Sequence, residues 1–313
     1  MSTKPSSTSK QWRPLVSIIC RCLNEKESVG IFLQMLSLQY YTNWELLVVD
    51  SGSTDGSIEV IKNSHPRVLK SIKKSEYNPG SVLNSMVQLA RGEIIVFNNA
   101  DCIPRNREWL SNLIFPLKYN WNGATFARQV GNSSLRLQVM RDLDRAYGFG
   151  FHNSQWFHFF SLASCATKRQ LLIENPFNPN FMYCEDIEWS YRIKKKKFNL
   201  IYVPLSHVEH RHNYGLNSIA KRSYNEGKAL AMIFPSRYQD YTFSRHLILA
   251  YLAELYYDFS FFLAQGYWFR MLFAFPYSIF YRAWQKISFY KGVVFTRKNF
   301  FRRDLFQKTK YVS

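Results

Sequence analysis

The amino-acid sequence predicts an α/β fold with a mainly parallel, doubly wound sheet, followed by a helical appendage. From Leu15 onward, short apolar runs rich in Val and Ile alternate with segments whose apolar residues have helical spacing. Such alternation is typical of βαβ units, in which helices connect parallel strands. Two of the runs end in a carboxylate, Asp50 and Asp101, and ligands of open α/β sheets bind at the carboxyl ends of the strands.

The first hundred residues divide into alternating strands and helices. Strands are indicated by β-branched apolar runs that end in polar turns, and helices by apolar residues three and four positions apart. In chain order they are a strand in LVSIICRCLNE, a helix in SVGIFLQMLSLQ, a strand in WELLVVDSGSTDGS, a short helix in SIEVIKNS, a helix in GSVLNSMVQLARG and a strand in EIIVFNNA.

The composition excludes a disordered chain and indicates a partner with negative charge. Of the 313 residues, 47% are hydrophobic and 17% aromatic, which is enough for one large domain with an appendage. The formal net charge of +19 fits nucleic acid, an anionic lipid or a phosphorylated substrate, without choosing among them. The five scattered cysteines lack the spacing of a disulfide framework or zinc knuckle, which favours the cytoplasm.

Changes in composition divide the chain into three regions. Residues 1–13 are polar and lack the apolar stretch of a secretion signal, so we expect a disordered leader. Residues 14–240 hold the alternating strands and helices and are expected to form the α/β domain. Residues 241–313 are aromatic and basic, and we expect a helical region that associates with a membrane or packs on the α/β domain.

The crevice at the strand ends does not match the commonest nucleotide-binding motifs. No G-x-G-x-x-G follows the first strand, and the chain has no G-x-x-x-x-G-K-[ST]. Ordinary dinucleotide and P-loop sites are therefore disfavoured, so the polar residues at the strand ends need another use.

Five motifs follow one another in a characteristic order between Leu15 and Leu230. They are VSIICRCLNEKESV, ELLVVDSGSTDGSIEVI, NPGSVLNSMVQLARGEIIVFNNADCIP, FNPNFMYCEDIEWSYRI and VEHRHNY. The series resembles the inverting, nucleotide-sugar-dependent glycosyltransferases of family two, which have the GT-A fold. It is most similar to rhamnosyltransferase-like members that build bacterial surface polysaccharides. Five motifs in order are far more specific than any one of them.

The resemblance implies where a nucleotide-sugar donor and a divalent metal ion bind. Asp50 is expected to contact the base or ribose of the nucleotide, the alternative being a plain turn residue. Asp101 is expected to bind Mg²⁺ or Mn²⁺ together with His212, with His210 as the competing choice. The remaining residues expected to line the donor site are Arg21, Asn24, Glu25, Gly80, Asn84 and Asn99.

The chain departs from the family pattern in two places. Where the family often has Asp-x-Asp, this chain has Asn99, Ala100 and Asp101, so only the last acid remains. Family members often carry an additional Arg in the segment where Val82 and Leu83 stand here. Because the diphosphate leaving group gains negative charge, cationic side chains are expected to contact it. The candidates are Arg21, Lys221 and Arg222.

An inverting transfer also needs a base on the acceptor side. The adjacent acids Glu185 and Asp186 in CEDIEW are the candidates. By the resemblance, Asp186 is expected to act as the general base, with Glu185 as its support or as an acceptor ligand. The alternative, acids that stabilise the first turn of a helix, is compatible with this role. Trp189 is expected to form a wall of the acceptor pocket, or else to lie in the core.

The last third of the chain has the composition of helices that lie at a membrane surface. From about His246 it is rich in aromatic residues, and charged residues interrupt each long apolar run, so we expect no clean membrane span. Amphipathic helices in the lipid interface, with a basic tail toward an anionic leaflet, fit this composition. The alternatives are packing on the α/β domain and formation of a homodimer.

Together these features predict a glycosyltransferase bound peripherally to the cytoplasmic face of a membrane. It would transfer a sugar, with inversion, from a nucleotide sugar to a lipid-linked or polysaccharide acceptor. The first alternative is a catalytically weak partner protein that binds nucleotide sugars. The second is a basic nucleic-acid-binding protein, but the sequence has no zinc finger, helix-turn-helix or RNP signature, and acids at the strand ends would repel phosphates.

Overall fold

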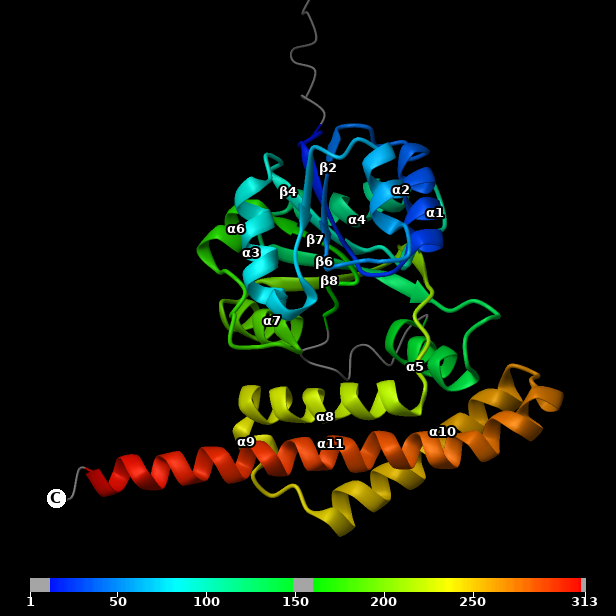
Figure 1. Cartoon of the computed structure of the whole chain (residues 1–313), viewed down its shortest axis with the longest axis vertical. Coiled ribbons are helices and arrows are strands. Elements are labelled where there is room, and N and C mark those ends of the chain that lie inside the picture. The colour runs from blue at the N-terminus through cyan, green and yellow to red at the C-terminus, as the bar shows by residue number, and fades with distance from the viewer. Residues whose placement is uncertain (1–11, 149–159, 311–313) are drawn as a thin grey trace, which may run out of the picture.

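An eight-stranded sheet of order β3-β2-β1-β4-β7-β6-β8-β5 lies at the centre of the chain (Figure 1). This computed structural model describes residues 12–148 and 160–310, apart from the side chains of 244, 245 and 300–310. Most of the expected leader therefore lies outside the described residues. The strands are β1 (Val16–Cys22), β2 (Trp44–Asp50), β3 (Val68–Ser71), β4 (Ile94–Asn99), β5 (Cys102–Pro104), β6 (Asn122–Val130), β7 (Ser164–Lys168) and β8 (Asn199–His210).

The half of the sheet that begins at β3 is parallel, as the alternation of strands and helices predicts. β1 pairs in parallel with β2 and β4, and β2 pairs in parallel with β3. Beyond β4 the sheet is mixed, because β7 runs antiparallel to β4 and β6, and β5 runs antiparallel to β8. β6 and β8 are parallel to each other. The antiparallel strands come from segments for which the sequence alone predicted no element.

Helices cover both faces of the sheet, and two apolar cores result. Successive residues of β1 point to opposite faces, so Ile18 packs with α1, α2 and α4, whereas Ile19 packs with α3, α6 and α7. The helices of this domain are α1 (Lys26–Ser37), α2 (Ser57–Asn63), α3 (Pro79–Leu89), α4 (Trp109–Ile114), α5 (Leu137–Tyr147), α6 (Arg169–Glu174) and α7 (Glu185–Lys195), with 3₁₀ turns at Lys74–Glu76 and Phe115–Lys118.

Local sequence explains where the two helices nearest the site begin. α3 starts at Pro79, whose fixed φ suits a first helical position, and the side chain of Asn78 caps it by accepting from Ser81 N–H over 2.9 Å. α7 starts at Glu185, with acids in its first turn and basic residues in its last, which favours both ends of the helix dipole.

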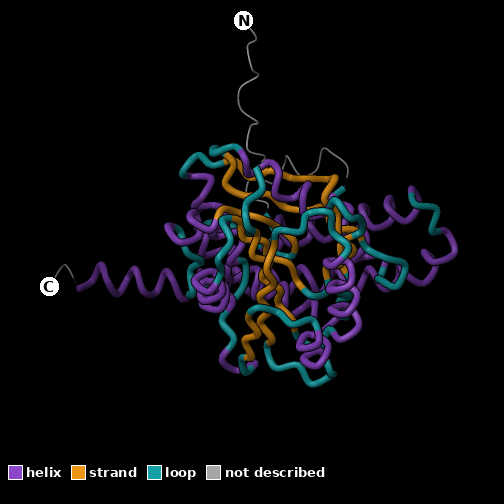
Figure 2. The backbone as a smooth tube through the Cα atoms, turned by 90° about the horizontal axis from the view of Figure 1, so that it is seen from above, coloured by secondary structure: helices purple, strands orange, loops and turns teal. Residues whose placement is uncertain are grey.

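The helical region lies along one side of the α/β domain (Figure 1), and in the view from above the C-terminal helix extends beyond the rest of the molecule (Figure 2). α8 and α11 pack with their backbones in contact, since a Cβ added at Gly227 would lie 2.3 Å from the carbonyl oxygen of Phe289. The expected division at residues 240 and 241 remains a prediction, although α8 precedes it. The elements are α8 (Leu216–Ile233), α9 (Pro235–Tyr238), a π-helix (Phe243–Ile248), α10 (Leu249–Ala264) and α11 (Trp268–Lys310).

Within the described part of the chain, one helical stretch has the length and composition to cross a membrane. It runs from His246 to Ala264, and only 22% of it is buried. Its two charged side chains, Glu254 and Asp258, both lie inside the protein. The sequence predicted that charged residues would interrupt every possible membrane span. In the structure these two acids do interrupt the apolar sequence, but they lie on the buried side of the helix and leave its exposed side without acids.

Candidate active site

The carboxyl ends of β1, β2 and β4 meet at one edge of the sheet and bring the first expected site residues together. Arg21 of β1 lies opposite Asn99 of β4, and the next residue, Cys22, lies opposite Asp50 of β2. Because parallel strands end at the same edge, side chains from three distant segments converge there.

Asp101 follows β4 and lies beside two histidines from the end of β8. β5 pairs with β8 so that Cys102 lies opposite His210, and Arg211 N–H donates to the Asp101 carbonyl over 3.0 Å. Asp101 Oδ2 is 3.4 Å from His210 Nε2 and 3.5 Å from His212 Nδ1. Burial alone would raise the pKa of the Asp101 carboxyl, but the two imidazoles hold that pKa well below its usual range.

The two histidines differ in their other contacts. His210 Nδ1 lies 2.7 Å from Gln129 Oε1, so its ring is held between β6 and Asp101. The His212 ring packs against Tyr214 with a centroid separation of 4.4 Å. The His212 side chain is 43% exposed and that of His210 is 17% exposed, so a ligand that enters from solvent reaches His212 more easily.

Glu25 completes a cluster with Asp101 and His212 that fits a divalent cation. One ligand atom from each lies within 4.8 Å of the others. Burial, and then the Asp101 carboxylate, raise the pKa of Glu25, so a cation between the two acids would stabilise both in their ionised forms. Two carboxylates and an imidazole suit Mn²⁺, and Mg²⁺ takes the same oxygens. A second group joins Asp101 to His210 and Cys102, but Cys102 is fully buried.

Arg21 connects the strand ends to the acids of α7. Its Nε donates to Asn99 Oδ1 over 3.0 Å, and its Nη1 donates to Glu185 Oε1 over 3.3 Å. Asn99, which stands where the family often has an acid, therefore accepts a hydrogen bond from Arg21. These two hydrogen bonds hold the guanidinium between the end of β4 and the start of α7.

Asp186 is the second residue of α7 and has an unusually basic carboxylate. Its Oδ1 accepts from Ile187 N–H over 2.9 Å. Burial, and then the charge of Glu185, raise the pKa of Asp186 to about 7, against the opposing effects of the Ile187 N–H and Arg21. A carboxylate that holds a proton near neutral pH has the basicity that a general base needs.

Asp50 forms a turn at the end of β2. Its Oδ2 accepts from the N–H groups of Gly52 and Ser53, each over 3.0 Å, and Gly52 has the positive φ that glycine tolerates. Its Oδ1 is buried with no hydrogen-bond partner among the described residues. Asn24 joins this turn to β1, because its Oδ1 accepts from Thr54 N–H over 2.8 Å. Asp50 therefore has the geometry of a turn residue, which was the alternative to a nucleotide contact. Its contact with a nucleotide stays a prediction.

Three other expected site residues support the loop around Phe177. A Cβ at Gly80 would lie 3.0 Å from the carbonyl oxygen of Asn178, so this glycine permits close approach of protein backbone. Asn84 donates to and accepts from the backbone of Phe177 over 2.8 and 2.9 Å. Trp189 is fully buried and donates to the Asn175 carbonyl over 2.8 Å. The expected acceptor wall at Trp189 is corrected, because an inaccessible indole cannot contact an acceptor.

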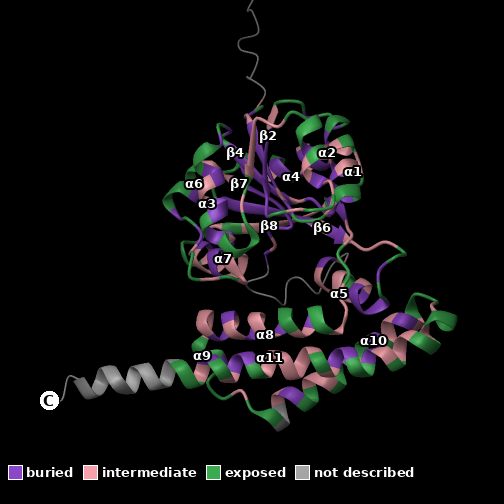
Figure 3. Ribbon diagram, viewed as in Figure 1, coloured by how far each residue is buried: buried purple, intermediate pink, exposed green. Residues whose placement is uncertain are grey.

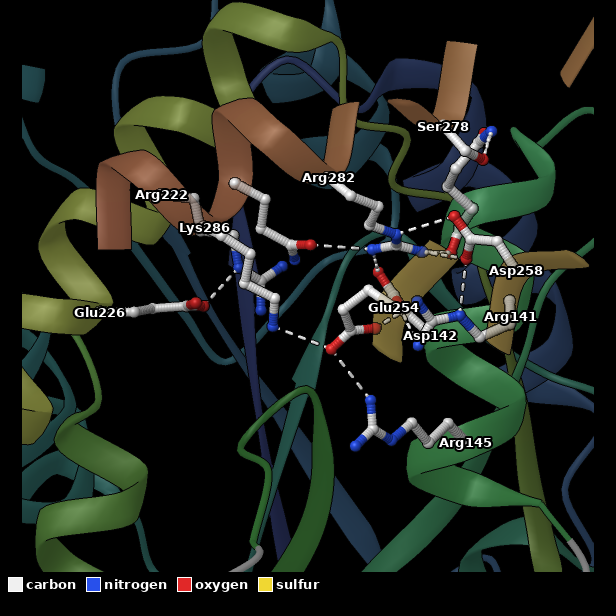
Figure 4. Close-up of polar contacts among 12 residues, drawn as sticks. Arg141, Asp142, Arg145, Arg222, Glu226, Glu254, Asp258, Ser278, Arg282 and Lys286 are labelled. Atoms are coloured by element: carbon white, nitrogen blue, oxygen red, sulfur yellow. Dashed lines mark hydrogen bonds and ion pairs between the residues drawn. The ribbon is translucent and has the colours of Figure 1, made fainter. Parts of the chain in front are cut away.

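The sequence did not predict that Glu25 lies near Asp101 and His212, or that Tyr214 packs against His212. Glu25 was expected in the donor site, and only the folded arrangement brings it to Asp101. Arg222 donates to the Tyr214 hydroxyl and, over 2.6 Å, to Glu226 Oε1, as the latter contact in Figure 4 indicates. Among the cationic residues expected to contact the diphosphate, Arg222 bonds to Tyr214, whose ring packs against His212. Arg21 lies at the strand ends. The signal for Tyr214 was its place two residues after His212 in the VEHRHNY motif.

Comparison with solved structures identifies the fold. The mannosyltransferase PcManGT from Pyrobaculum calidifontis, in complex with GDP-Man and Mn²⁺, superposes with a TM-score of 0.61 over 91% of this chain and 88% of that one, at 19% identity. Glucosyl-3-phosphoglycerate synthase from Mycobacterium tuberculosis, in complex with Mn²⁺, UDP and phosphoglyceric acid, gives a TM-score of 0.53 over 74% of this chain and 84% of that one, at 20% identity. The fold is that of the GT-A glycosyltransferases.

Sequence comparison places the chain in a family. A model of glycosyl transferase family 2 matches residues 17–182, which is more than half of the 313 residues. The chain belongs to glycosyl transferase family 2. It is 29% identical to glycosyltransferase AglE of Haloferax volcanii over 31% of this chain and 33% of the relative. It is 32% identical to the Escherichia coli UDP-Glc:alpha-D-GlcNAc-diphosphoundecaprenol beta-1,3-glucosyltransferase WfgD over 31% and 37%.

The chain therefore spans about a third of the length of these curated relatives. The expected family and fold are confirmed. Neither relative carries a rhamnosyltransferase name, so the rhamnosyltransferase-like specificity stays a prediction.

Proposed function

We propose that the chain transfers a sugar, with inversion, from a nucleotide-sugar donor to a lipid-linked or polysaccharide acceptor. The observation that carries this proposal is the arrangement of two kinds of acid around Arg21. On one side lies the Asp101 cluster, which fits a divalent cation, and on the other lies Asp186, whose pKa is raised to about 7. A transfer from a diphosphate needs both a charge-neutralising group and a base.

A divalent metal ion, Mn²⁺ or Mg²⁺, is the proposed cofactor. Asp101, His212 and Glu25 would hold it, and the bound ion would neutralise charge on the diphosphate. The complexes of the two structural neighbours, both with Mn²⁺, support this choice. Arg21 and Arg222 are the cationic side chains available to assist at the diphosphate, with Asp50, Asn24 and Asn99 at the nucleotide side of the crevice.

Asp186 is the proposed general base of a single displacement. It would accept the proton of the acceptor hydroxyl as that oxygen bonds to the anomeric carbon. The bond from this carbon to the diphosphate breaks on the opposite face, and its electron pair leaves with the diphosphate, so the configuration inverts. Glu185 supports this step by holding Arg21 and by raising the pKa of Asp186 through its negative charge.

The proposed acceptor is carried by a lipid or is part of a growing polysaccharide. The name of the WfgD relative specifies an acceptor on diphosphoundecaprenol, and a lipid carrier would require the enzyme to work at a membrane. Peripheral attachment to the cytoplasmic face is therefore part of the proposal. The net charge of +19 favours an anionic leaflet. The alternative of a catalytically weak nucleotide-sugar-binding protein rests on Asn99 in place of the first family acid.

A donor screen followed by product analysis tests this function. Thermal unfolding is measured with each nucleoside diphosphate and its sugars, with Mn²⁺ and with chelator. A ligand at 100 times its dissociation constant raises the free energy of unfolding by about 2.7 kcal/mol. With the donor known, NMR of the product gives its anomeric configuration, and we expect inversion. Metal-dependent binding of a sugar nucleotide without any turnover would favour the binding-protein alternative, and retention would refute the single displacement.

A further inference from the structure

The charged residues of α10 face the protein, whereas several of its large apolar residues face outward. Glu254 and Asp258 are the only charged residues of this helix, and they are 9% and 0% exposed. Leu249, Leu252 and Tyr256 are 60%, 53% and 65% exposed. A soluble protein normally places apolar side chains inside and charges outside, so this helix has the reverse pattern.

A buried ionic network explains why the acids point inward (Figure 4). Asp258 accepts from Arg141 of α5 over 2.8 Å and from Arg282 of α11 over 2.8 and 2.9 Å. Glu254 pairs with Arg141 and, over 2.8 Å, with Lys286 of α11. Crossing a bilayer would separate α10 from α5 and leave these charges unpaired in lipid, which is strongly unfavourable. The network therefore favours a helix that stays on the protein.

α11 continues the outward apolar surface. Its exposed side chains recur every three or four residues over its first half, which places them on one side of the helix. Figure 3 shows exposed positions along α10 and the start of α11. We call the large apolar residues that are at least 40% exposed on α10 and on the first half of α11 the outer apolar face: Leu249, Leu252, Tyr256, Tyr257, Phe259, Trp268, Phe269, Leu272, Phe273, Ile279, Phe280 and Trp284. Soluble proteins rarely leave so large an apolar patch in water.

A basic hollow lies at the margin of the outer apolar face. It has a volume of about 370 Å³ and is lined by Arg136 and Leu137 at the start of α5 and by Arg270, Phe273 and Tyr277 of α11, among others. The Arg136 guanidinium lies 4.8 Å from the centre of the Tyr277 ring. Two arginines beside an apolar surface match a phosphate headgroup beside its acyl chains. A second copy of the chain, which has the same net charge of +19, would bring positive charge instead.

We propose that the outer apolar face lies in the lipid–water interface of an anionic membrane, with α10 and α11 parallel to the bilayer and lipid phosphates at Arg136 and Arg270. This inference rests on the proposed lipid-linked acceptor and names the surface that would bring the enzyme to it. The aromatic residues would occupy the headgroup boundary, where Trp and Tyr are enriched. The ionic network would keep the helices attached to α5 and so to the α/β domain.

Co-sedimentation of the full chain with phosphatidylcholine–phosphatidylglycerol vesicles tests the surface. The variant is Phe269→Ser with Phe273→Ser, two side chains that are 77% and 74% exposed. The matched control is Phe115→Ser with Leu205→Ser, which are 58% and 70% exposed on the α/β domain. Since burial of each Phe stabilises binding, we expect the variant to partition at least about tenfold more weakly. The control should partition as the unmutated chain does.

Three further measurements separate the outcomes. Brominated lipids should quench Trp fluorescence, and Trp268→Phe with Trp284→Phe should abolish most of that quenching. Equal partitioning of the unmutated chain and the Phe269→Ser, Phe273→Ser variant would overturn the inference. So would light scattering that finds a dimer disrupted by this variant, together with no vesicle binding. Turnover of nucleotide sugar with a water-soluble acceptor, measured in parallel, reports on the proposed function alone and should be the same in variant and control.

Discussion

Arg21 at the end of β1 and Glu185 at the start of α7 form an ion pair across the crevice, with Nη1 and Oε1 3.3 Å apart. Nε of the same guanidinium donates a hydrogen bond to Asn99 Oδ1 over 3.0 Å. Glu185 in turn raises the pKa of the adjacent Asp186. Arg21 thereby connects the strand ends, near the candidate metal site at Asp101, to Asp186, which is proposed to deprotonate the acceptor hydroxyl.

The raised pKa of Asp186 predicts an acid limb in the pH profile of turnover. The base acts only when ionised, so kcat/KM should fall as the pH drops below about 7. Glu185→Gln removes the neighbouring charge that raises this pKa, and the limb should move to lower pH. The check is a profile of initial rates for both proteins. An unchanged limb in the Glu185→Gln variant would show that another group titrates.

The same shift has a consequence for stability with the opposite sign. The folded chain keeps the Asp186 proton up to about pH 7, whereas an unfolded Asp loses it near pH 4. The folded state therefore binds more protons in this interval, so ionisation of Asp186 contributes a decrease in the free energy of unfolding as the pH rises. Asp186→Asn should flatten this part of the pH dependence in urea titrations.

Asp101 is expected to matter for diphosphate binding mainly in the presence of metal. Asp101→Ala removes the carboxylate that lies between the two histidines. Calorimetry with Mn²⁺ should give an affinity for nucleoside diphosphate that is weaker by about tenfold or more, since even residues around a metal ligand contribute about 10-fold to 100-fold. With chelator, variant and unmutated protein should differ little. Equal affinity of the unmutated protein with Mn²⁺ and with chelator would remove the metal role.

Glu25 is predicted to be a third metal ligand that offsets the missing family acid at Asn99. Glu25→Gln should weaken binding of Mn²⁺ alone, followed by electron paramagnetic resonance without nucleotide, because a neutral amide is a poorer ligand for a hard cation. Glu27→Gln is the control, since Glu27 is 85% exposed in its pair with Arg211. If Glu25 contacts only the nucleotide-sugar donor, in keeping with its expected place in the donor site, Mn²⁺ affinity should be the same in both variants.

The family motifs made much of the site predictable, but not its internal division of roles. The resemblance of VEHRHNY to a family motif was enough to place His212 beside Asp101, which follows β4. The position of Glu25 near Asp101 required the register of β1 beside β4, which no local pattern encodes. Trp189 was ambiguous because an aromatic one turn from an acid has the same spacing whether it lines a pocket or packs in the core.

The parallel strands β1, β2 and β4 were predictable because each one is a short, continuous apolar run between helices, whereas the four-residue β3 with its Lys70 was not predicted. The antiparallel strands were not predicted either, since β5 has only the three residues Cys102–Pro104 and β8 is interrupted by Pro204 and ends in polar residues. The helical region shows the same limit. Glu254 and Asp258 read as interruptions of an apolar helix, because their partner Arg141 lies 113 and 117 positions away in the chain.

The most direct test of the proposed transfer compares donor binding with turnover in Asp186→Asn. Asn keeps the size of the side chain but cannot accept the acceptor proton, so kcat should fall by roughly 10² to 10⁴. The dissociation constant of the nucleotide sugar with Mn²⁺, measured by calorimetry on the same preparation, should stay nearly unchanged. Loss of donor affinity with unaltered turnover would contradict the account, because Asp186 would then belong to the donor site and another group would serve as the base.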